Sequence, residues 1–111
     1  MKHVTFADKS LLVDDETADL LLEYAAALAR RGEADAVDIR ALGSDGDDVT
    51  ATLLLDAGAP IMAETAQTSM PGPDNGPALA YMREQLARLS PLAVTPGEVR
   101  GIGSYDDLDL L

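Results

Sequence analysis

The sequence predicts a small α+β domain in which two helices pack on one face of an antiparallel or mixed sheet of three to five strands. Short runs of alternating polar and apolar residues indicate strands, and two stretches with apolar residues three and four positions apart indicate helices. The elements follow the order β(β)-α-β-β-β-α, which is typical of such two-layer folds. A chain of 111 residues has room for one core. We expect a single domain over residues 1–91 and a loosely ordered or disordered tail over residues 92–111.

The first elements are two short strands and a helix. Residues 3–6 and 10–13 are rich in β-branched and apolar side chains, and residues 7–9 can turn between them to give a hairpin or one bent strand. Asp14 is a typical helix N-cap, and the acidic residues after it favour the positive end of the helix dipole. Gly32 follows two arginines and ends the helix, since glycine readily takes the left-handed conformation. The apolar stripe of this helix consists of Leu20, Leu21, Tyr24, Ala25 and Leu28.

Three strands follow with a period of two. They cover residues 36–42, 49–56 and 61–67. An Asp-Gly turn over residues 43–48 joins the first two into a hairpin, and residues 57–60 form the second turn.

A second helix follows a connector rich in proline and glycine over residues 70–77. Pro77 suits the first position of a helix, and Ser90 with Pro91 ends it. Its apolar stripe consists of Leu79, Met82, Leu86 and Leu89.

Helices on one face leave the other face of the sheet open. The alternation directs a mixed row outward, which is either a solvated surface or a self-complementary patch that favours a two-fold dimer. We expect the interaction surface to include Arg40, Leu54, Met62 and Glu64. The remaining outward residues are Asp38, Leu42, Thr50 and Thr52.

The charge is strongly negative. Twenty acidic residues against eight basic ones give a formal charge of −12. This charge disfavours direct binding of nucleic acid and of anionic membranes, and it attracts a basic protein partner. The acidity could instead reflect a bacterial-like composition set by a GC-rich genome or a saline cytoplasm. No apolar run reaches membrane-spanning length and the start lacks a signal sequence, so we expect a cytoplasmic protein.

The residues that carry catalysis are scarce. The chain has no cysteine and a single histidine, His3, and no nucleophile or phosphate-binding motif occurs. Residues 45–48 do not fit a calcium loop. We therefore expect no catalytic residue, metal or cofactor. A carboxylate remains the best candidate for chemistry: Glu64 lies in an apolar strand and could polarise a pocket together with Tyr81.

The tail combines acidic and apolar residues. Tyr105, Leu108 and Leu111 would share one face of a helix, in the manner of short segments that order on docking to a larger partner. An unconstrained terminus, or one that folds back over the sheet, is the alternative.

The sequence thus predicts a non-catalytic, acidic interaction protein of the adaptor, inhibitor or immunity type, which is homodimeric or binds a larger basic protein. A ligand-binding or enzymatic domain with a pocket near Glu64 is the alternative, and mimicry of nucleic acid is a third possibility.

Overall fold

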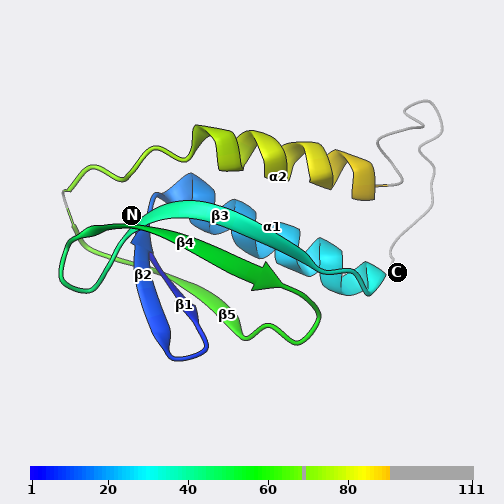
Figure 1. Ribbon diagram of the computed structural model, residues 1–111, viewed down its shortest axis with the longest axis horizontal. Helices are drawn as coiled ribbons and strands as arrows, with labels where there is room; N and C mark the ends of the chain where they lie inside the picture. Colours follow the sequence, from blue (N-terminus) through cyan, green and yellow to red (C-terminus); the bar gives the residue numbers. More distant parts are fainter. Residues whose placement is uncertain (69, 91–111) are drawn as a thin grey trace.

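The computed structural model describes residues 1–68 and 70–90, and it has the predicted order of elements (Figure 1). The described chain is a small α+β fold. The predicted tail and its docking residues Tyr105, Leu108 and Leu111 lie outside the described residues. The elements are β1 (Lys2–Phe6), β2 (Lys9–Val13), α1 (Asp15–Arg31), β3 (Asp35–Leu42), β4 (Asp48–Leu55), β5 (Ile61–Thr65) and α2 (Gly76–Leu89).

The strands form one antiparallel sheet in the order β4-β3-β2-β1-β5. The β1–β2 and β3–β4 hairpins are paired along their whole lengths, and β5 pairs with the other side of β1. In contrast, β2 and β3 meet at a single residue pair, Leu12 and Leu42. The β3–β4 hairpin therefore diverges from the other three strands, as Figure 1 shows.

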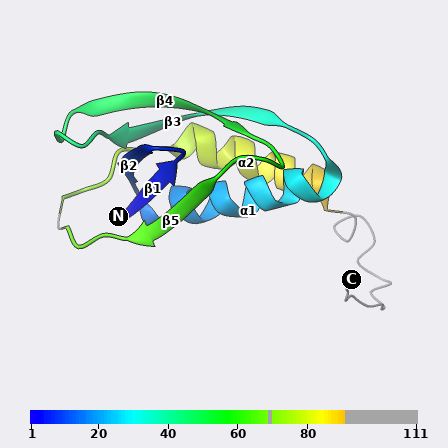
Figure 2. The same ribbon diagram turned by 90° about the horizontal axis from the view of Figure 1, so that it is seen from below.

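Both helices lie on the same side of the sheet, as predicted. α1 packs against β1 and β5, whereas α2 packs against α1 and β3. Figure 2 shows the two helices side by side beneath β3 and β4. The core between the layers includes Val4, Leu21, Tyr24, Leu28, Ile39, Leu55 and Met82.

The ends of α1 are determined by the residues that the sequence indicates. A side-chain oxygen of Asp14 accepts hydrogen bonds from the backbone N–H of Thr17 at 3.0 Å and from its hydroxyl at 2.9 Å. Gly32 ends the helix with a φ of 64°, in the left-handed region. These two signals depend only on neighbouring residues, which is why the sequence predicts them.

The first two strands form a hairpin rather than one bent strand. Their turn contains Ala7 and Asp8, and Ala7 has a φ of 57°. A positive φ at the first position of a two-residue turn matches the right-handed twist of the flanking strands, but glycine is the residue that adopts it without strain.

One sequence-based assignment to the open face is wrong. Leu42 was expected to enlarge the outward apolar row, but only 6% of its surface is exposed. Leu42 is the residue at which β3 meets Leu12 of β2, and this junction shields it from solvent. The apolar surface of the open face is correspondingly smaller.

A buried asparagine takes the place of a neighbouring strand for part of β3. The Asn75 side chain accepts a hydrogen bond from the Arg40 N–H at 2.7 Å and donates one to the Arg40 carbonyl at 2.9 Å. Its amide also donates to Asp14 at 3.0 Å. Asn75 therefore joins β3 to the residues that begin both helices.

Candidate interaction surface

The four expected surface residues all lie exposed on the open face of the sheet, but they do not form one patch. Leu54 is 56% exposed on β4 and Met62 is 51% exposed on β5. β4 and β5 are the two outer strands, so about 19 Å of sheet separates them at the usual strand spacing. Arg40 lies on the same hairpin as Leu54, and Glu64 lies on the same strand as Met62. The structure therefore contains two separate candidate surfaces.

The second surface brings together residues that the sequence analysis treated separately. Glu64 is the cross-strand neighbour of His3, and Met62 is the neighbour of Thr5. Glu64 is exposed there, whereas Tyr81 lies on α2, beyond the other face of the sheet. A pocket polarised jointly by Glu64 and Tyr81 is therefore not part of this fold. Strand alternation directs Glu64 to the face opposite the helices.

The backbone of β4 shows which of its groups lack a partner. Arg40 directs both of its backbone polar groups to Asn75 and is paired in register with Thr50. In an antiparallel ladder such residues form a non-hydrogen-bonded pair, so the N–H and C=O of Thr50 also point away from β3. The alternation of the ladder extends this orientation to Thr52 and Leu54. No backbone hydrogen bond connects these three residues to another segment of the described chain.

Beyond its first residue, Asp48, β4 has no side chain that protects this edge. Residues 49–55 contain no charged residue, proline or glycine, and Leu54 adds an exposed apolar side chain. Outer strands of monomeric proteins usually carry lysine, proline or a bulge that prevents pairing with another chain. β5, the other outer strand, is shorter, follows Pro60 and contains Glu64. The edge of β4 is thus better suited than the edge of β5 to pair with a strand of another chain.

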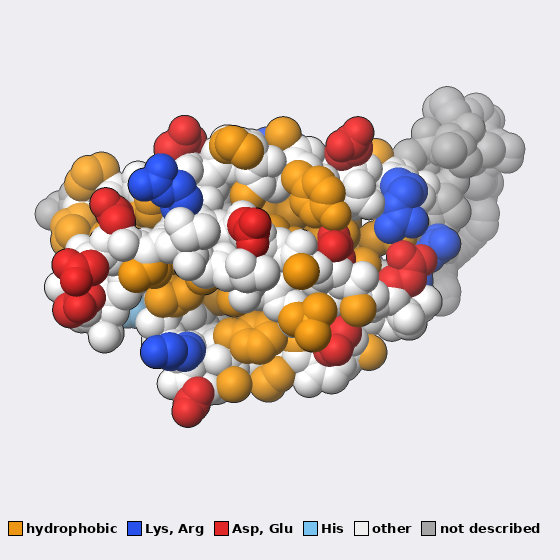
Figure 3. All heavy atoms as spheres, in the orientation of Figure 1, with side chains coloured by type: hydrophobic (Ala, Val, Ile, Leu, Met, Phe, Trp, Pro, Cys, Tyr) orange, Lys and Arg blue, Asp and Glu red, His pale blue; other side chains and the backbone are white. Residues whose placement is uncertain are grey.

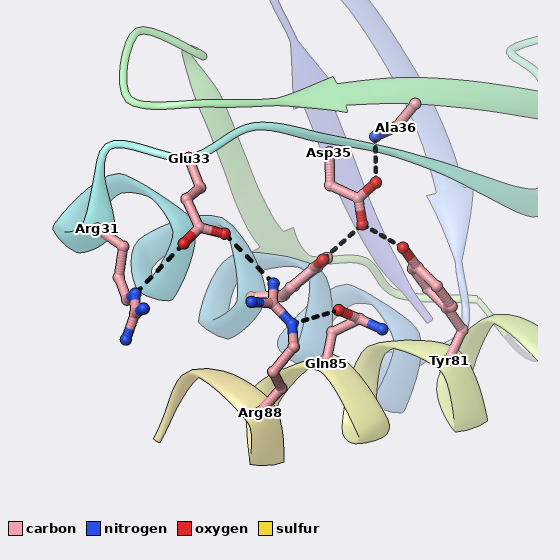
Figure 4. A network of polar contacts seen from close by, with 8 residues as sticks. Arg31, Glu33, Asp35, Ala36, Tyr81, Gln85 and Arg88 are labelled. Carbon is pink, nitrogen blue, oxygen red and sulfur yellow. Dashed lines mark hydrogen bonds and ion pairs between the residues drawn. The ribbon is translucent and has the colours of Figure 1, made fainter. Parts of the chain in front are cut away.

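A carboxylate and two tyrosines form a second polar cluster, in addition to that around Asn75 (Figure 4). Asp35, at the start of β3, accepts hydrogen bonds from the hydroxyls of Tyr24 and Tyr81, each at 2.5 Å. Its other oxygen accepts from the Ala36 N–H at 2.9 Å. The two rings meet edge to face with centroids 6.5 Å apart. Asp35 therefore links α1, α2 and β3.

The pKa values in this cluster indicate that Asp35 connects parts of the fold and does not act as a general base. Burial alone would raise the pKa of Asp35, but the hydrogen bonds from Tyr24 and Tyr81 outweigh it and hold that pKa below the usual value. Burial and the hydrogen bond to Asp35 raise the pKa of Tyr24 well above its usual value. The hydrogen bond to Asp35 also raises the pKa of Tyr81. A carboxylate that already accepts three hydrogen bonds has little capacity left to take a proton from a substrate.

Two grooves lined by described residues are of the size of a ligand pocket. One, of about 560 Å³, opens between the β1–β2 hairpin and β4, where the two hairpins diverge. The other, of about 600 Å³, lies where α1 and α2 end. The apolar lining of the first groove consists of Val4, Phe6, Leu11, Val49, Ala51 and Leu53. Glu64 lines neither of them.

No group of three or more potential ligands that could hold a metal ion is found among the residues that the structure describes. Neither helix in the described ranges combines the length and apolar composition needed to cross a membrane. Comparison with protein-family models, with curated proteins and with solved structures gave no significant match.

Proposed function

We propose that this protein is a non-catalytic interaction domain that forms a homodimer by pairing the edge of β4 with β4 of a second copy. The observation that supports this proposal is the unprotected edge itself. Three residues, Thr50, Thr52 and Leu54, present N–H and C=O groups that no described segment satisfies. Adding a strand satisfies them without any rearrangement of the fold.

A second copy fits this edge because antiparallel pairing about a two-fold axis is self-complementary. With the axis at Thr52, Thr50 of one copy lies opposite Leu54 of the other. This register places the three outward residues of each strand in hydrogen-bonded pairs and gives about six bonds between the copies. The two sheets then form one continuous layer, and the exposed Leu54 side chain packs against the threonines of its partner.

The acidic character of the chain opposes this pairing without preventing it. The formal charge of −12 makes two copies repel each other at long range. The paired segment itself is uncharged, and its flanking residues Asp48 and Asp56 face each other across the interface in the register centred on Thr52. Repulsion within the interface is therefore confined to the ends of the strand, and salt screens both this repulsion and the long-range one.

Sedimentation equilibrium of the full chain tests the proposal. The unaltered protein should sediment as a dimer, and Leu54→Lys should weaken association at least tenfold, since a charged side chain on an outer strand opposes pairing. Met62→Lys is the matched control because Met62 is equally exposed on the opposite outer strand, and it should leave the dimer intact. A monomeric unaltered protein, or equal effects of the two substitutions, would contradict the proposal.

A larger basic protein is the other partner suggested by the charge. It would occupy the same edge by supplying an extended segment, as an adaptor, inhibitor or immunity-type contact requires. Association of this kind weakens as salt is added, whereas association of two acidic copies strengthens. The sign of the salt dependence therefore separates the two partners.

The apolar groove between the hairpins supports a second candidate function, the binding of a small ligand. Its volume lies in the range of ligand pockets, and its lining is mostly apolar. Lys9 and Asp45 both line this groove, so its charged groups balance, and Lys9 is the residue that would contact the carboxylate of a mainly apolar ligand. Titration with a fatty acid tests this function: saturable binding lost in Phe6→Asp supports it, and no binding rejects it.

A further inference from the structure

The groove at the ends of the helices has an apolar floor and a basic end. Ala27 of α1 and Leu86 and Leu89 of α2 form the floor, and Arg30 and Arg31 lie where α1 ends. Glu23, earlier on α1, also lines the groove. Ser90, the residue directly after α2, also lines this groove. The chain therefore passes from α2 into residues 91–111 at the groove itself.

Basic residues are scarce in this protein, and three of the seven among the described residues lie at this end. The chain has eight lysines and arginines against twenty acidic residues. Arg30, Arg31 and Arg88 all lie in the last turns of the two helices. Figure 3 shows basic side chains at the end of the molecule where the two helices finish.

These arginines are only partly neutralised within the described residues. Glu33 pairs with Arg31 at 3.4 Å and with Arg88 at 3.2 Å, so one carboxylate serves two guanidinium groups. Arg30 is exposed and forms no ion pair with any described residue. Glu23, the acidic residue of the lining, lies about two turns before Arg30 on α1, so the end formed by Arg30 and Arg31 favours acidic groups and the floor favours apolar ones.

We propose that the groove receives residues 105–111 of the same chain. In a helical conformation Tyr105, Leu108 and Leu111 share one face and would contact the apolar floor. In such a helix Asp107 and Asp109 would flank the apolar face, within reach of Arg30 and Arg31, and Asp106 would lie on the opposite side.

The intervening sequence is long enough for this contact. Residues 91–104 can span up to about 46 Å when fully extended, far more than is needed to return to a groove that begins at Ser90. A segment tethered by a linker of this length meets the groove at an effective concentration on the order of millimolar. Contacts that are weak between separate molecules are therefore sufficient within one chain. Docking does not require the β4 interface.

Paramagnetic broadening in the full chain tests this proposal. Because the chain has no cysteine, Ser104→Cys provides a single site for a nitroxide spin label. The amide signals of Ala27, Leu86 and Ala87 should then broaden several-fold more than those of the β1–β2 turn. Arg30→Gln combined with Arg31→Gln should remove most of this excess, and so should Leu108→Ser combined with Leu111→Ser.

Arg83→Gln is the matched control, since Arg83 is an exposed arginine of α2 that pairs with Glu16 outside this groove. It should leave the broadening unchanged. Equal broadening throughout the protein, or equal loss in Arg83→Gln and in the Arg30 and Arg31 double variant, would overturn the proposal. A mixture of isotope-labelled chain with spin-labelled, isotope-free chain identifies the source: broadening of the same strength there assigns the segment to a second copy and overturns docking within one chain.

Discussion

The Asn75 side-chain amide donates a hydrogen bond to a carboxylate oxygen of Asp14 at 3.0 Å. Because Asp14 is the N-cap of α1 and Asn75 is the N-cap of α2, this bond connects the starts of the two helices. The same side chain is bonded to both backbone groups of Arg40 on β3. Asn75 is 4% exposed, and both the oxygen and the amino group of its side chain are hydrogen-bonded. One buried amide thus fixes the relative positions of both helices and the sheet.

Asn75→Ala should lower the free energy of unfolding by about 2–3 kcal/mol, because it leaves partly buried backbone groups of Arg40 without partners. Asn75→Asp should be at least as damaging at neutral pH, since it places a second carboxylate beside Asp14. The loss of stability in Asn75→Asp should be smaller at acid pH, because a protonated carboxyl can donate a hydrogen bond as the amide does. Urea denaturation at several pH values measures both effects, and a pH-independent deficit in Asn75→Asp would argue against this arrangement.

The link between Asp35 and the two tyrosines should make stability depend on acid pH. The pKa of Asp35 is below its usual value of 3.8 in the folded protein, so the unfolded chain holds the proton more tightly. The stabilisation is present above about pH 3.8 and is lost as the pH falls through the lower, folded pKa. Asp35→Asn should flatten the fall in stability over this range. Asp8→Asn, at an exposed turn residue, is the control and should leave the slope unchanged.

Ionisation of Tyr24 should make stability depend on alkaline pH as well. The pKa of Tyr24 is raised from its usual value of 10.0, so the folded protein favours the neutral phenol. The resulting stabilisation is present below pH 10 and falls as the pH rises above it. Tyr24→Phe should reduce this alkaline loss, and denaturation curves at increasing pH measure it. Tyr24→Phe should also lower stability at neutral pH by about 1–2 kcal/mol, because Asp35 loses one donor.

Substitution of Ala7, in the turn between β1 and β2, should increase the stability of the protein. Ala7 has a φ of 57°, a conformation that costs an alanine free energy but not a glycine. Ala7→Gly should stabilise the protein by about 0.5–1 kcal/mol. This figure is the backbone strain that glycine relieves, reduced by the larger conformational entropy that glycine loses on folding. Ala7→Val should destabilise it, since β-branched residues tolerate this region poorly. Thermal unfolding ranks the three proteins, and stabilisation by valine would show that this turn adopts another conformation.

Association through β4 should strengthen as salt is added. Two copies, each with a formal charge of −12, repel each other until ions screen them. The dissociation constant should therefore fall between low and physiological ionic strength, and sedimentation in a sodium chloride series measures it. Dissociation promoted by salt would instead indicate an interface held by ion pairs, which residues 49–55 cannot provide because none of them is charged.

The local features of this fold could be predicted from sequence because neighbouring residues determine them. The stripe of α1, its cap at Asp14 and its end at Gly32 each depend on side chains within a few positions. The alternation of β3 and β4 likewise shows which side chains face the helices. The outward position of Leu54 follows from this pattern alone.

The features that define the candidate interface depend on contacts between distant residues. Alternation says which face a residue occupies but not the order of strands, so it could not show that Leu54 and Met62 lie on opposite outer strands. Asn75 was one turn-forming residue among several in a loop rich in proline and glycine, and its bonds to Arg40 join positions 35 residues apart. The burial of Leu42 depends on the same divergence of the hairpins.

Amide hydrogen exchange along β4 reports whether two copies pair through this strand. The N–H groups of Val49, Ala51 and Leu53 face β3 and should be protected at every protein concentration. Those of Thr50, Thr52 and Leu54 should exchange rapidly in dilute solution and become protected as the concentration rises through the dissociation constant. Persistent rapid exchange at these three positions, at a concentration where the protein sediments as a dimer, would show that the copies associate through another surface.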